Sequence, residues 1–417
     1  MAVTRLKILF LSHRIPYPPN KGDKIRSWHL LNLCTRLGAV DLVTHADDPR
    51  DLRHCEHLRE SCRSVFVERL GAWTGRFRAG VALLGSTPLS VAWMTRTHVR
   101  RHVADLIANN DYDLIVAFST QVASYVPKGC TVPVVLDAVD VDSEKWAAYG
   151  RHNGLRSLVA RVEAKRMRRY EQCCGQRAGR VVLCTPREAA LWREVVQSGT
   201  VMHIGNGVAV PDEVPGAAAR EADLMVFSGA MDYEPNVLAA QLAARVILPE
   251  VRALRPGARL RIVGRNPTAS VKALAALPGV EVTGEVPSMK PHLEAASIAL
   301  VPLTIARGIQ NKVLEALAHG LPVVTTPVVA ASLQDNGAGG MAVCAPEDMA
   351  AVASALLGDV AARERMAKLG RRHAQRNHCW SHFDAAFGQL FASIAQTKPV
   401  VGTQPQASAA KAPSTCP

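Results

Sequence analysis

Residues 301–326 have the types and spacing of an anion-binding site. Their sequence, VPLTIARGIQNKVLEALAHGLPVVTT, predicts a strand, a polar loop containing Gly308 and a helix that begins near Asn311. With Asn311 as N-cap, the free amides and the positive dipole end of this helix face the loop, where they can bind phosphate. Lys312 adds a mobile cation, and Glu315, one turn further, can accept two hydrogen bonds from a ribose. In a purely structural role, Glu315 would only complement the helix dipole.

Three carboxylates lie close together in the sequence VPVVLDAVDVDSEKW. Asp137, Asp140 and Asp142 fall within six residues, and they repel one another unless a cation, a proton or hydrogen-bond donors offset their charge. Asp140 and Asp142 match the Asp-x-Asp pattern with which one class of sugar transferases holds a divalent cation. Two alternatives are that Asp140 positions a hydroxyl group, or that these are an N-cap aspartate and its solvated neighbours before a helix at 143–149.

The loop HRIPYPPNKGDK, residues 13–24, follows the first predicted strand. A nicotinamide- or flavin-binding domain would carry Gly-x-Gly-x-x-Gly here, and its absence argues against a dehydrogenase or an epimerase of that kind. Three prolines and Lys21-Gly22-Asp23 predict a rigid loop opening onto a helix at 24–36. Because ligands enter α/β sheets at the carboxyl ends of strands, this loop is a candidate binding segment, and a plain connector is the alternative.

Residues 151–180 are strongly basic, with nine lysines and arginines against two glutamates. Apolar residues recur in this segment at helical spacing: Leu155, Leu158, Val159, Val162, Tyr170, Cys173 and Cys174. A basic amphipathic helix of this type can lie on an anionic membrane surface. The alternative is a packed helix with a solvated basic back. We expect no nucleic-acid binding, because no recognised module surrounds the helix.

The composition of the 417-residue chain indicates a soluble protein with an anionic partner. Hydrophobic residues make up 48% and charged residues 20%, which is ordinary for a chain that buries a full core. The formal charge of +13 favours nucleic acid, a membrane surface or a phosphorylated small molecule as the partner. Aromatic residues make up only 5%, which disfavours single-stranded nucleic acid, because such sites need stacking platforms.

The sequence predicts neither a targeting segment nor a metal site. No apolar run reaches the roughly 18–20 residues that span a bilayer, and the first apolar stretch, at 8–11, is too short for a signal peptide. The ten cysteines include no Cys-x-x-Cys pair, which predicts reduced thiols in a cytosol. The cluster of His54, Cys55, His57 and Cys62 fits no standard zinc spacing, so we expect a solvated helix face there.

Short apolar runs alternate with longer amphipathic stretches, and this pattern predicts βαβ units. The runs are continuously apolar, as expected for parallel strands covered by helices on both faces. Twelve strands are predicted, at 7–11, 40–44, 64–68, 114–118, 132–137, 180–185, 223–229, 259–264, 280–284, 298–303, 322–326 and 341–345.

Twelve strands are too many for one compact sheet, and residues 209–222 divide them into two sets of six. This segment is rich in Pro, Ala and charge and has no apolar periodicity. We therefore expect a domain at 1–208, a linker at 209–222 and a second domain at 223–378. A last helix follows at 379–396, and the tail at 397–417 is expected to be disordered, because it holds few large apolar residues.

Residues 301–326 resemble the donor-site signature of family 4 glycosyltransferases with the GT-B fold, usually Glu-Gly-(Phe)-Gly…Glu-Ala-Met-Ala-x-Gly-x-Pro-Val-Val. Supporting matches are Asn206-Gly207-Val208 and the segments 226–229 and 261–264. The strings PYPPNKGDKIRSWH, LDAVDVDSEKW, MDYEPNV and RGIQNKVLEA resemble the sugar transferases associated with exosortase/PEP-CTERM exopolysaccharide systems. The likeness covers about residues 5–395.

The sequence departs from the family pattern at three places. The first signature Glu falls on Arg307, and the histidine often found after the fifth strand falls near Val139 and Asp140. The Arg/Lys pair often placed after the opening strand of the second domain is not evident in 229–236. Arg307, Arg265 and Lys312 are candidates to supply that positive charge instead.

The resemblance implies an α/β architecture of two Rossmann-like, doubly wound parallel-sheet domains that face an interdomain cleft, with the last helix packing back on the first domain. It also implies retaining transfer of a sugar from a nucleotide-diphosphate donor, with no obligatory metal or other cofactor. The implied donor-binding residues are Asn206, Arg265, Arg307, Gly308, Asn311, Lys312 and Glu315. Lys21, Gly22 and Asp23 are implied to face the acceptor, and the implied catalytic residues are Asp140, Arg265 and Lys312.

The implied acceptor is a glycan or a lipid-linked glycan of exopolysaccharide or cell-surface polysaccharide biosynthesis. We expect a cytoplasmic enzyme, peripheral on the inner face of the cytoplasmic membrane through the basic helix at 151–180. Three alternatives stay open. They are an Asp-x-Asp metal-dependent glycosyltransferase, a non-hydrolysing nucleotide-sugar epimerase, and an inactive scaffold of an export complex, for which Arg307 in place of the first Glu argues.

Overall fold

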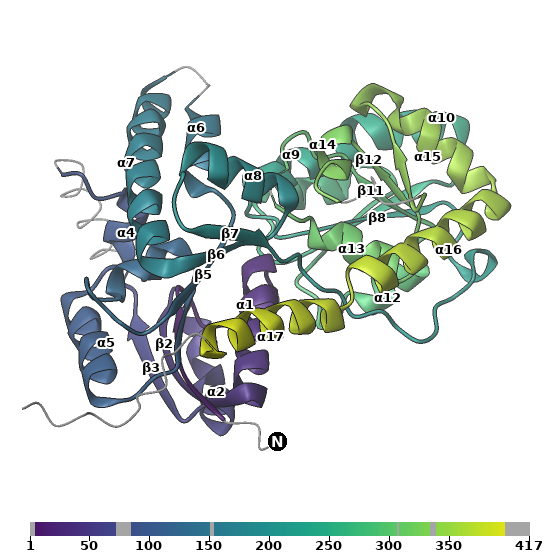
Figure 1. Ribbon diagram of the computed structural model, residues 1–417. Helices are drawn as coiled ribbons and strands as arrows, with labels where there is room; N and C mark the ends of the chain where they lie inside the picture. Colours follow the sequence, from purple (N-terminus) through teal and green to yellow (C-terminus); the bar gives the residue numbers. More distant parts are fainter. Residues whose placement is uncertain (1–4, 72–84, 151–153, 307, 334–338, 397–417) are drawn as a thin grey trace, which may run out of the picture.

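The protein folds into two domains that each contain one parallel sheet (Figure 1). The computed structural model describes residues 5–71, 85–150, 154–306, 308–333 and 339–396. The first sheet has seven strands in the order β3-β2-β1-β4-β5-β6-β7, and the second has six in the order β10-β9-β8-β11-β12-β13. Every pair of neighbouring strands is parallel. The predicted fold class, two doubly wound parallel sheets, is confirmed.

The strands of the first sheet are β1 (Leu6–Ser12), β2 (Gly38–Ala46), β3 (Ser64–Arg69), β4 (Leu114–Phe118), β5 (Val134–Val139), β6 (Gly179–Leu183) and β7 (Thr200–His203). Those of the second are β8 (Leu224–Ser228), β9 (Arg259–Val263), β10 (Val280–Gly284), β11 (Ile298–Val301), β12 (Val323–Thr325) and β13 (Met341–Val343). The expected count of six strands in the first domain is wrong, because β7 was not predicted. Its sequence, TVMH, lies at the sheet edge and is only partly buried, so it lacks a continuous apolar run.

Helices cover both faces of each sheet. In the first domain they are α1 (Gly22–Leu37), α2 (Cys55–Ser61), α4 (Leu89–Met94), α5 (Thr97–Asn109), α6 (Asp142–Tyr149), α7 (Leu155–Ala178) and α8 (Pro186–Val195). The second domain contains α9 (Glu234–Leu242), α10 (Leu248–Leu254), α11 (Ala269–Lys272), α12 (Lys290–Ala295), α13 (Asn311–Ala318), α14 (Pro327–Ala330), α15 (Met349–Gly358) and α16 (Val360–Asn377). The last helix is α17 (Trp380–Gln396).

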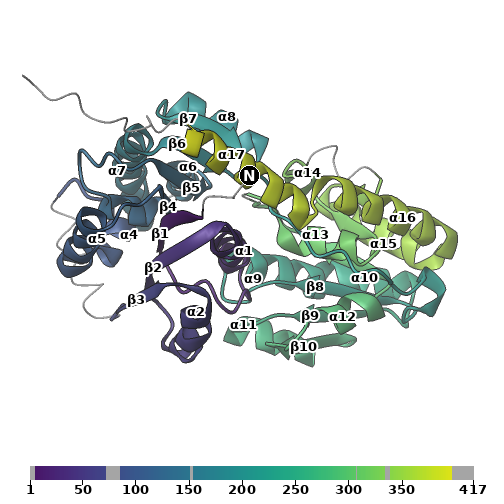
Figure 2. The same ribbon diagram turned by 60° about the horizontal axis from the view of Figure 1, so that its bottom comes forward.

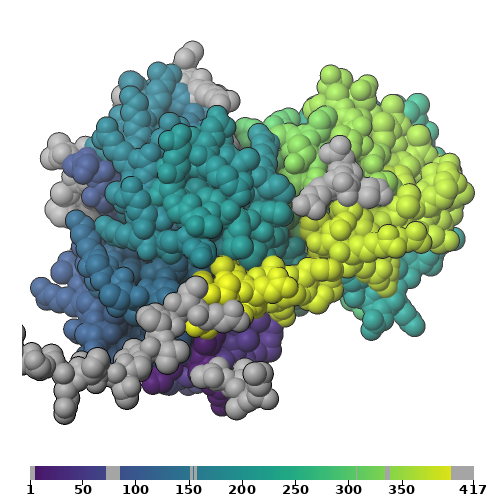
Figure 3. All heavy atoms as spheres, viewed as in Figure 1, coloured from purple at the N-terminus to yellow at the C-terminus, as the bar shows by residue number. Residues whose placement is uncertain are grey.

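Two chain segments that lie side by side connect the domains. The backbone N–H of Val208 on the outgoing segment donates to the carbonyl of His378 on the returning one at 2.6 Å. A Cβ atom on Gly207 would lie 2.3 Å from the Trp380 ring, so only glycine allows this approach. Beyond it, α17 crosses to the first domain, as Figures 2 and 3 show, and Phe387 is buried in the first-domain core.

Residues 209–222 wrap around the second domain. Buried Arg220 donates hydrogen bonds to the carbonyls of Leu293, Ala296 and His319. The N–H of Ala217 donates to Glu364. The segment thus has little regular structure, as its Pro-rich sequence predicts, but its polar groups hold it on the second domain.

Candidate functional site

The helix α13 begins at Asn311 itself. Gln310 is its N-cap, without a side-chain capping bond, so the prediction that Asn311 caps the helix is wrong by one residue. The Asn311 side chain instead accepts a hydrogen bond through Oδ1 from Nδ2 of Asn206 at 2.9 Å, which ties it to the first domain. The amides of the first turn still lack intrahelical partners, as at any helix start.

The N-terminal ends of α1 and α13, one from each domain, lie against each other. A Cβ atom on Gly22, the first residue of α1, would lie 3.3 Å from Nδ2 of Asn311. Lys21 is the N-cap of α1 and adds a positive charge beside this contact. Two positive dipole ends and a lysine therefore converge at the domain interface, an arrangement that favours an anion.

Lys312 and Glu315 lie in the first turns of α13 and are half-buried. Nζ of Lys312 donates to Oδ1 of Asn236 at 2.5 Å and lies 4.9 Å from the centroid of the Phe227 ring. Burial lowers the pKa of Lys312 to about 7 and raises the pKa of Glu315 to about 7, and the opposite charge of each partner only partly offsets this. Burial thus disfavours the charged form of both groups, and a phosphate bound beside Lys312 would favour its charged form.

The carboxyl ends of β8 and β9 meet beside this pair. A Cβ atom on Gly264 would lie 1.7 Å from the carbonyl oxygen of Gly229, and one on Gly229 would lie 2.7 Å from Asn236. Arg265 follows directly, and its Nε is buried with no hydrogen-bond partner among the described residues. Burial also lowers the pKa of Arg265. An unfilled buried donor next to Gly264 is a place where a ligand oxygen would be stabilised.

We call Gly308, Asn311, Lys312, Glu315 and Arg265 the α13 site. Arg307, which the sequence also assigns to it, lies outside the described residues, as does the tail at 397–417.

Asp140 of the first domain reaches the loop before α13. Its Oδ1 accepts a hydrogen bond from Sγ of Cys184 at 3.1 Å. Gly308 has a φ of 58°, and a Cβ atom on it would lie 2.5 Å from the same Oδ1. The left-handed backbone and the lack of space both require glycine here. The structure thus brings Asp140 to the edge of the α13 site.

The three neighbouring carboxylates are each offset by a different partner. Asp137 is fully buried against Arg26, and Asp142 accepts from Nε2 of Gln121 at 2.9 Å. Asp140 and Asp142 thus have different hydrogen-bond partners. In the described part of the chain, no group of three or more His, Cys, Asp or Glu could hold a metal, and this includes the cluster around His57.

Asp23 is engaged in an ion-pair cluster at the start of α1. It pairs with Nε2 of His13 at 3.1 Å and with Nη1 of Arg14 at 2.8 Å. Burial alone would raise the pKa of Asp23, but His13 and Arg14 hold it well below its usual range. His13 and Arg14 were not predicted, although they lie in the loop that the sequence singled out.

Lys145 of the first domain and Tyr233 of the second are two further residues that were not predicted, and they interact electrostatically with each other. Burial alone would lower the pKa of Lys145, but the carboxylates of Asp142 and Asp140 raise it above its usual value. Lys145 lies in LDAVDVDSEKW, and Tyr233 and Asn236 lie in MDYEPNV, so the quoted motifs already contained the signal.

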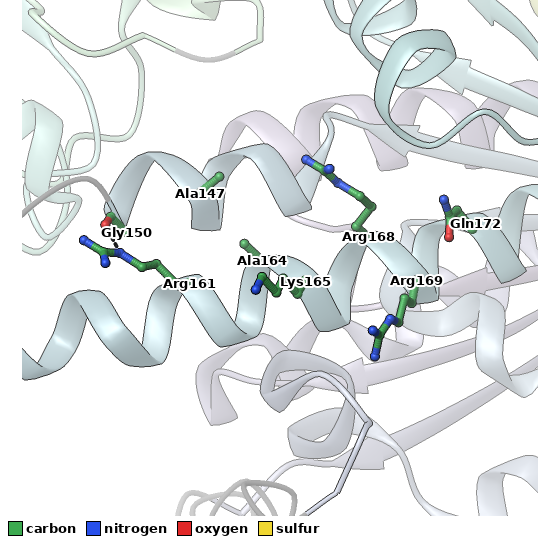
Figure 4. Close-up of a pocket in the computed structure, with 8 residues that line it drawn as sticks. All are labelled: Ala147, Gly150, Arg161, Ala164, Lys165, Arg168, Arg169 and Gln172. Atoms are coloured by element: carbon green, nitrogen blue, oxygen red, sulfur yellow. Dashed lines mark hydrogen bonds between the residues drawn. The ribbon is translucent and has the colours of Figure 1, made fainter.

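A groove of about 730 Å³ lies between α6 and α7 (Figure 4). Its cations all come from α7 and are Arg161, Lys165, Arg168 and Arg169. Nε of Arg161 donates to the carbonyl of Gly150 at 2.8 Å, and Arg168 pairs with Glu144 at 2.7 Å. We call this the α7 groove.

The predicted apolar stripe of this helix splits into two parts. Cys174 is buried in the core of the first domain, with Tyr170 packed against it. Leu158, Val159 and Val162 are 57%, 39% and 47% exposed, and they line a separate hollow with Leu89 of α4. The side chain of Leu155 lies outside the described part, and no described helix is long and apolar enough to span a membrane.

Comparisons with known proteins identify the fold family of this architecture. Residues 222–359 match the family described as Glycosyl transferases group 1. The chain covers its structural neighbours almost completely. The fold is GT-B. Sucrose-phosphate synthase from Thermosynechococcus elongatus has a TM-score of 0.71 at 18% identity, over 94% of this chain and 100% of that one.

Two other GT-B neighbours have comparable similarity. HepE of Anabaena, in complex with UDP and glucose, has a TM-score of 0.64 at 14% identity, over 93% of this chain and 100% of that one. WaaG, described as a glycosyltransferase involved in lipopolysaccharide biosynthesis, has a TM-score of 0.63 at 19% identity, over 91% and 98%. No curated protein matches the sequence. The group 1 match supports transferase activity for this chain, and the neighbours show that its fold is GT-B.

Proposed function

We propose that the protein is a retaining glycosyltransferase that moves a sugar from a nucleotide-diphosphate donor to a glycan or a lipid-linked glycan. One observation carries the proposal: the ends of α1 and α13 meet at the domain interface beside Lys312 and beside Nε of Arg265, which has no hydrogen-bond partner in the described part of the chain. Convergent amides and cations are what a diphosphate needs. HepE, a GT-B protein of the same architecture, binds UDP-glucose, which supports this donor class.

In this proposal the α13 site holds the donor. The amides at Gly308 and Asn311, with Lys312 and Arg265, bind the diphosphate, and Glu315 accepts hydrogen bonds from the ribose. Asn206 acts beside them through Asn311. Gly22 also belongs to the donor side, because a Cβ atom on it would lie 3.3 Å from Nδ2 of Asn311.

The acceptor approaches from the first domain, past Asp140 and the loop of Lys21 and Asp23. As the bond from the sugar carbon to the diphosphate breaks, the acceptor oxygen bonds to that carbon on the same face. The acceptor proton passes to the leaving diphosphate oxygen, so no protein nucleophile or metal is required. Lys312 and Arg265 stabilise the charge that develops on the diphosphate, an effect on the order of several kcal/mol in a water-poor site.

We further propose that α7 rests on the anionic inner surface of the cytoplasmic membrane. Its cations and the exposed Leu158, Val159 and Val162 form adjoining basic and apolar surfaces, as in helices that bind anionic lipid. A membrane location fits a lipid-linked acceptor of exopolysaccharide or cell-surface polysaccharide synthesis. The motifs similar to exosortase-associated transferases support this role, as does WaaG, which is involved in lipopolysaccharide biosynthesis.

The test of the donor assignment is a nucleotide-sugar panel measured by thermal shift. A ligand present at about 100 times its dissociation constant adds roughly 2.7 kcal/mol of stability. The hit is then titrated by calorimetry into wild type, Glu315→Ala and Lys312→Ala. We expect both substitutions to weaken binding, and unchanged affinity in both would refute the donor assignment.

The same nucleotide sugar distinguishes the alternatives. Interconversion of the sugar without an acceptor would indicate an epimerase, and loss of activity in EDTA together with Asp140→Ala would indicate an Asp-x-Asp metal enzyme. Binding without turnover with any acceptor would indicate a scaffold. We expect none of these outcomes.

A further inference from the structure

Arg26 of α1 is fully buried, and all its hydrogen bonds are internal. Its Nε and Nη2 donate to the two carboxylate oxygens of Asp137 at 2.8 and 3.1 Å. Its Nη1 donates to the carbonyl of Ile204 and to Oδ1 of Asn206, both at 2.8 Å. A planar guanidinium that donates to four acceptor atoms at once fixes the two segments that carry them, β5 and the segment of Ile204 and Asn206.

These contacts place Arg26 where both interdomain connections leave the first domain. Ile204 and Asn206 lie on the outgoing segment, directly before the contact of Val208 with the returning chain. On the returning side, the Phe383 and Phe387 rings of α17 lie 5.3 and 5.7 Å from Cζ of Arg26. One side chain thus contacts the outgoing and the returning connection.

The network continues into the second domain through a single amide. Because Arg26 has only donors, it fixes Oδ1 of Asn206 on its own side. Nδ2 of Asn206 is therefore directed at Oδ1 of Asn311, 2.9 Å away, the first residue of α13. Asp137, Arg26, Asn206 and Asn311 form one continuous chain of hydrogen bonds from the first sheet to the α13 site.

We propose that Arg26 is a positioning residue that sets the placement of the α13 site against the first domain by holding Asn206. This inference rests on the proposed function, since it assigns the relay to donor binding. Sub-ångström placement of donors and cations decides how well they stabilise developing charge. Arg26 therefore acts on the donor without touching it.

The central test compares Asn206→Ala, which breaks the relay but keeps the Arg26–Asp137 pair, with Arg26→Lys, which keeps the charge but not the fork. We expect each to raise the donor KM and nucleotide Kd about tenfold, in line with the loss of one or two well-aligned hydrogen bonds. The acceptor KM should not change. The double variant should raise the donor KM and the nucleotide Kd little more than either single variant does, because the two substitutions break the same relay.

The matched control is Arg36→Gln. Arg36 lies on the same helix and pairs with Asp384 of α17 at 2.6 Å, outside the relay. Arg36→Gln should leave the donor KM unchanged. This result would distinguish an effect of the relay on donor binding from the effect of loosening the contact between α1 and α17. Melting temperatures of all variants identify a folding defect, and the Asn206→Ala result carries the conclusion if Arg26→Lys unfolds.

If the wild type binds a nucleotide and Asn206→Ala binds it with the same Kd, the inference is overturned and the proposed function stays intact. Failure of the wild type to bind any nucleotide would overturn the proposed function itself. A distance between labels on the two domains, measured by electron-spin resonance, adds a readout besides activity. We expect a broader interdomain distance distribution in Asn206→Ala than in wild type or Arg36→Gln, and identical distributions would also count against the relay.

Discussion

The α13 site and the α7 groove both contain several cations, but those of the α13 site are partly buried and those of the α7 groove are exposed to solvent. Lys312 and Arg265 are desolvated, and burial lowers the pKa of each. The α7 cations lie in solvent, and Arg168 is 46% exposed. Desolvated, positioned cations select one ligand geometry, whereas solvated cations attract any anionic surface and are screened by salt. This difference is the basis for proposing a small diphosphate as the ligand of the α13 site and a lipid surface as the partner of the α7 groove.

The largest expected effect tests the α7 groove. Replacing Arg161, Lys165, Arg168 and Arg169 together by Gln should weaken binding to vesicles with anionic lipid by about 10³-fold, since each cation near such a surface contributes about 1 kcal/mol. Sedimentation with vesicles measures this. Nucleotide affinity should be unaffected. An equal loss of binding to vesicles of neutral lipid would show that the α7 cations do not act through their charge.

Lys312→Ala should give the next largest effect. Removing the cation closest to the proposed diphosphate should reduce turnover about 100-fold, as for the loss of one preorganised charge-stabilising group. Steady-state kinetics with the identified donor measure it. Lys165→Ala is the control, because it removes a solvated lysine from the α7 groove. Equal losses of turnover in the two variants would contradict the claim that Lys312 has a role in turnover that Lys165 lacks.

Gly308→Ala should lower turnover by about tenfold or more. The left-handed φ costs a non-glycine residue roughly 1–2 kcal/mol, and the new Cβ would collide with Asp140. Gly388→Ala is the matched control, since a Cβ there meets nothing within 4 Å. It lies within α17, so it should raise the melting temperature slightly. Full activity in Gly308→Ala would show that the loop does not close on Asp140.

The smallest effect is a pH dependence confined to the α13 site. Because the pKa of Lys312 is about 7, the ligand-free residue loses its charge as the pH rises above 7. A diphosphate requires the charged form, so nucleotide affinity should fall about fivefold between pH 7 and pH 8. Calorimetry at pH 7 and pH 8 measures this and should also show proton uptake on binding. Vesicle binding should stay constant over this range, and a flat nucleotide profile would refute the role of Lys312.

Much of the fold follows from local sequence. The β4 strand, LIVAF, is continuously apolar and was predicted at its observed bounds, 114–118, because a parallel strand buried on both faces leaves that pattern. The edge strand β7 leaves no such signal. The start of α13 was predicted within one residue, but Asn311 was assigned the capping role because a free Asn normally caps. Its actual partner, Asn206, lies 105 residues away.

The sequence by itself therefore determined twelve of the thirteen strands, and it predicts the division at 209–222 and the segment in which a phosphate site would lie, since each depends on contacts or periodicity within a few residues. Tertiary structure alone decided that Gly22 lies against Asn311, that Arg26 neutralises Asp137 and that Lys312 loses basicity. These depend on which residues the two sheets bring together and on how much water they exclude, and neither quantity is a property of any local stretch of chain.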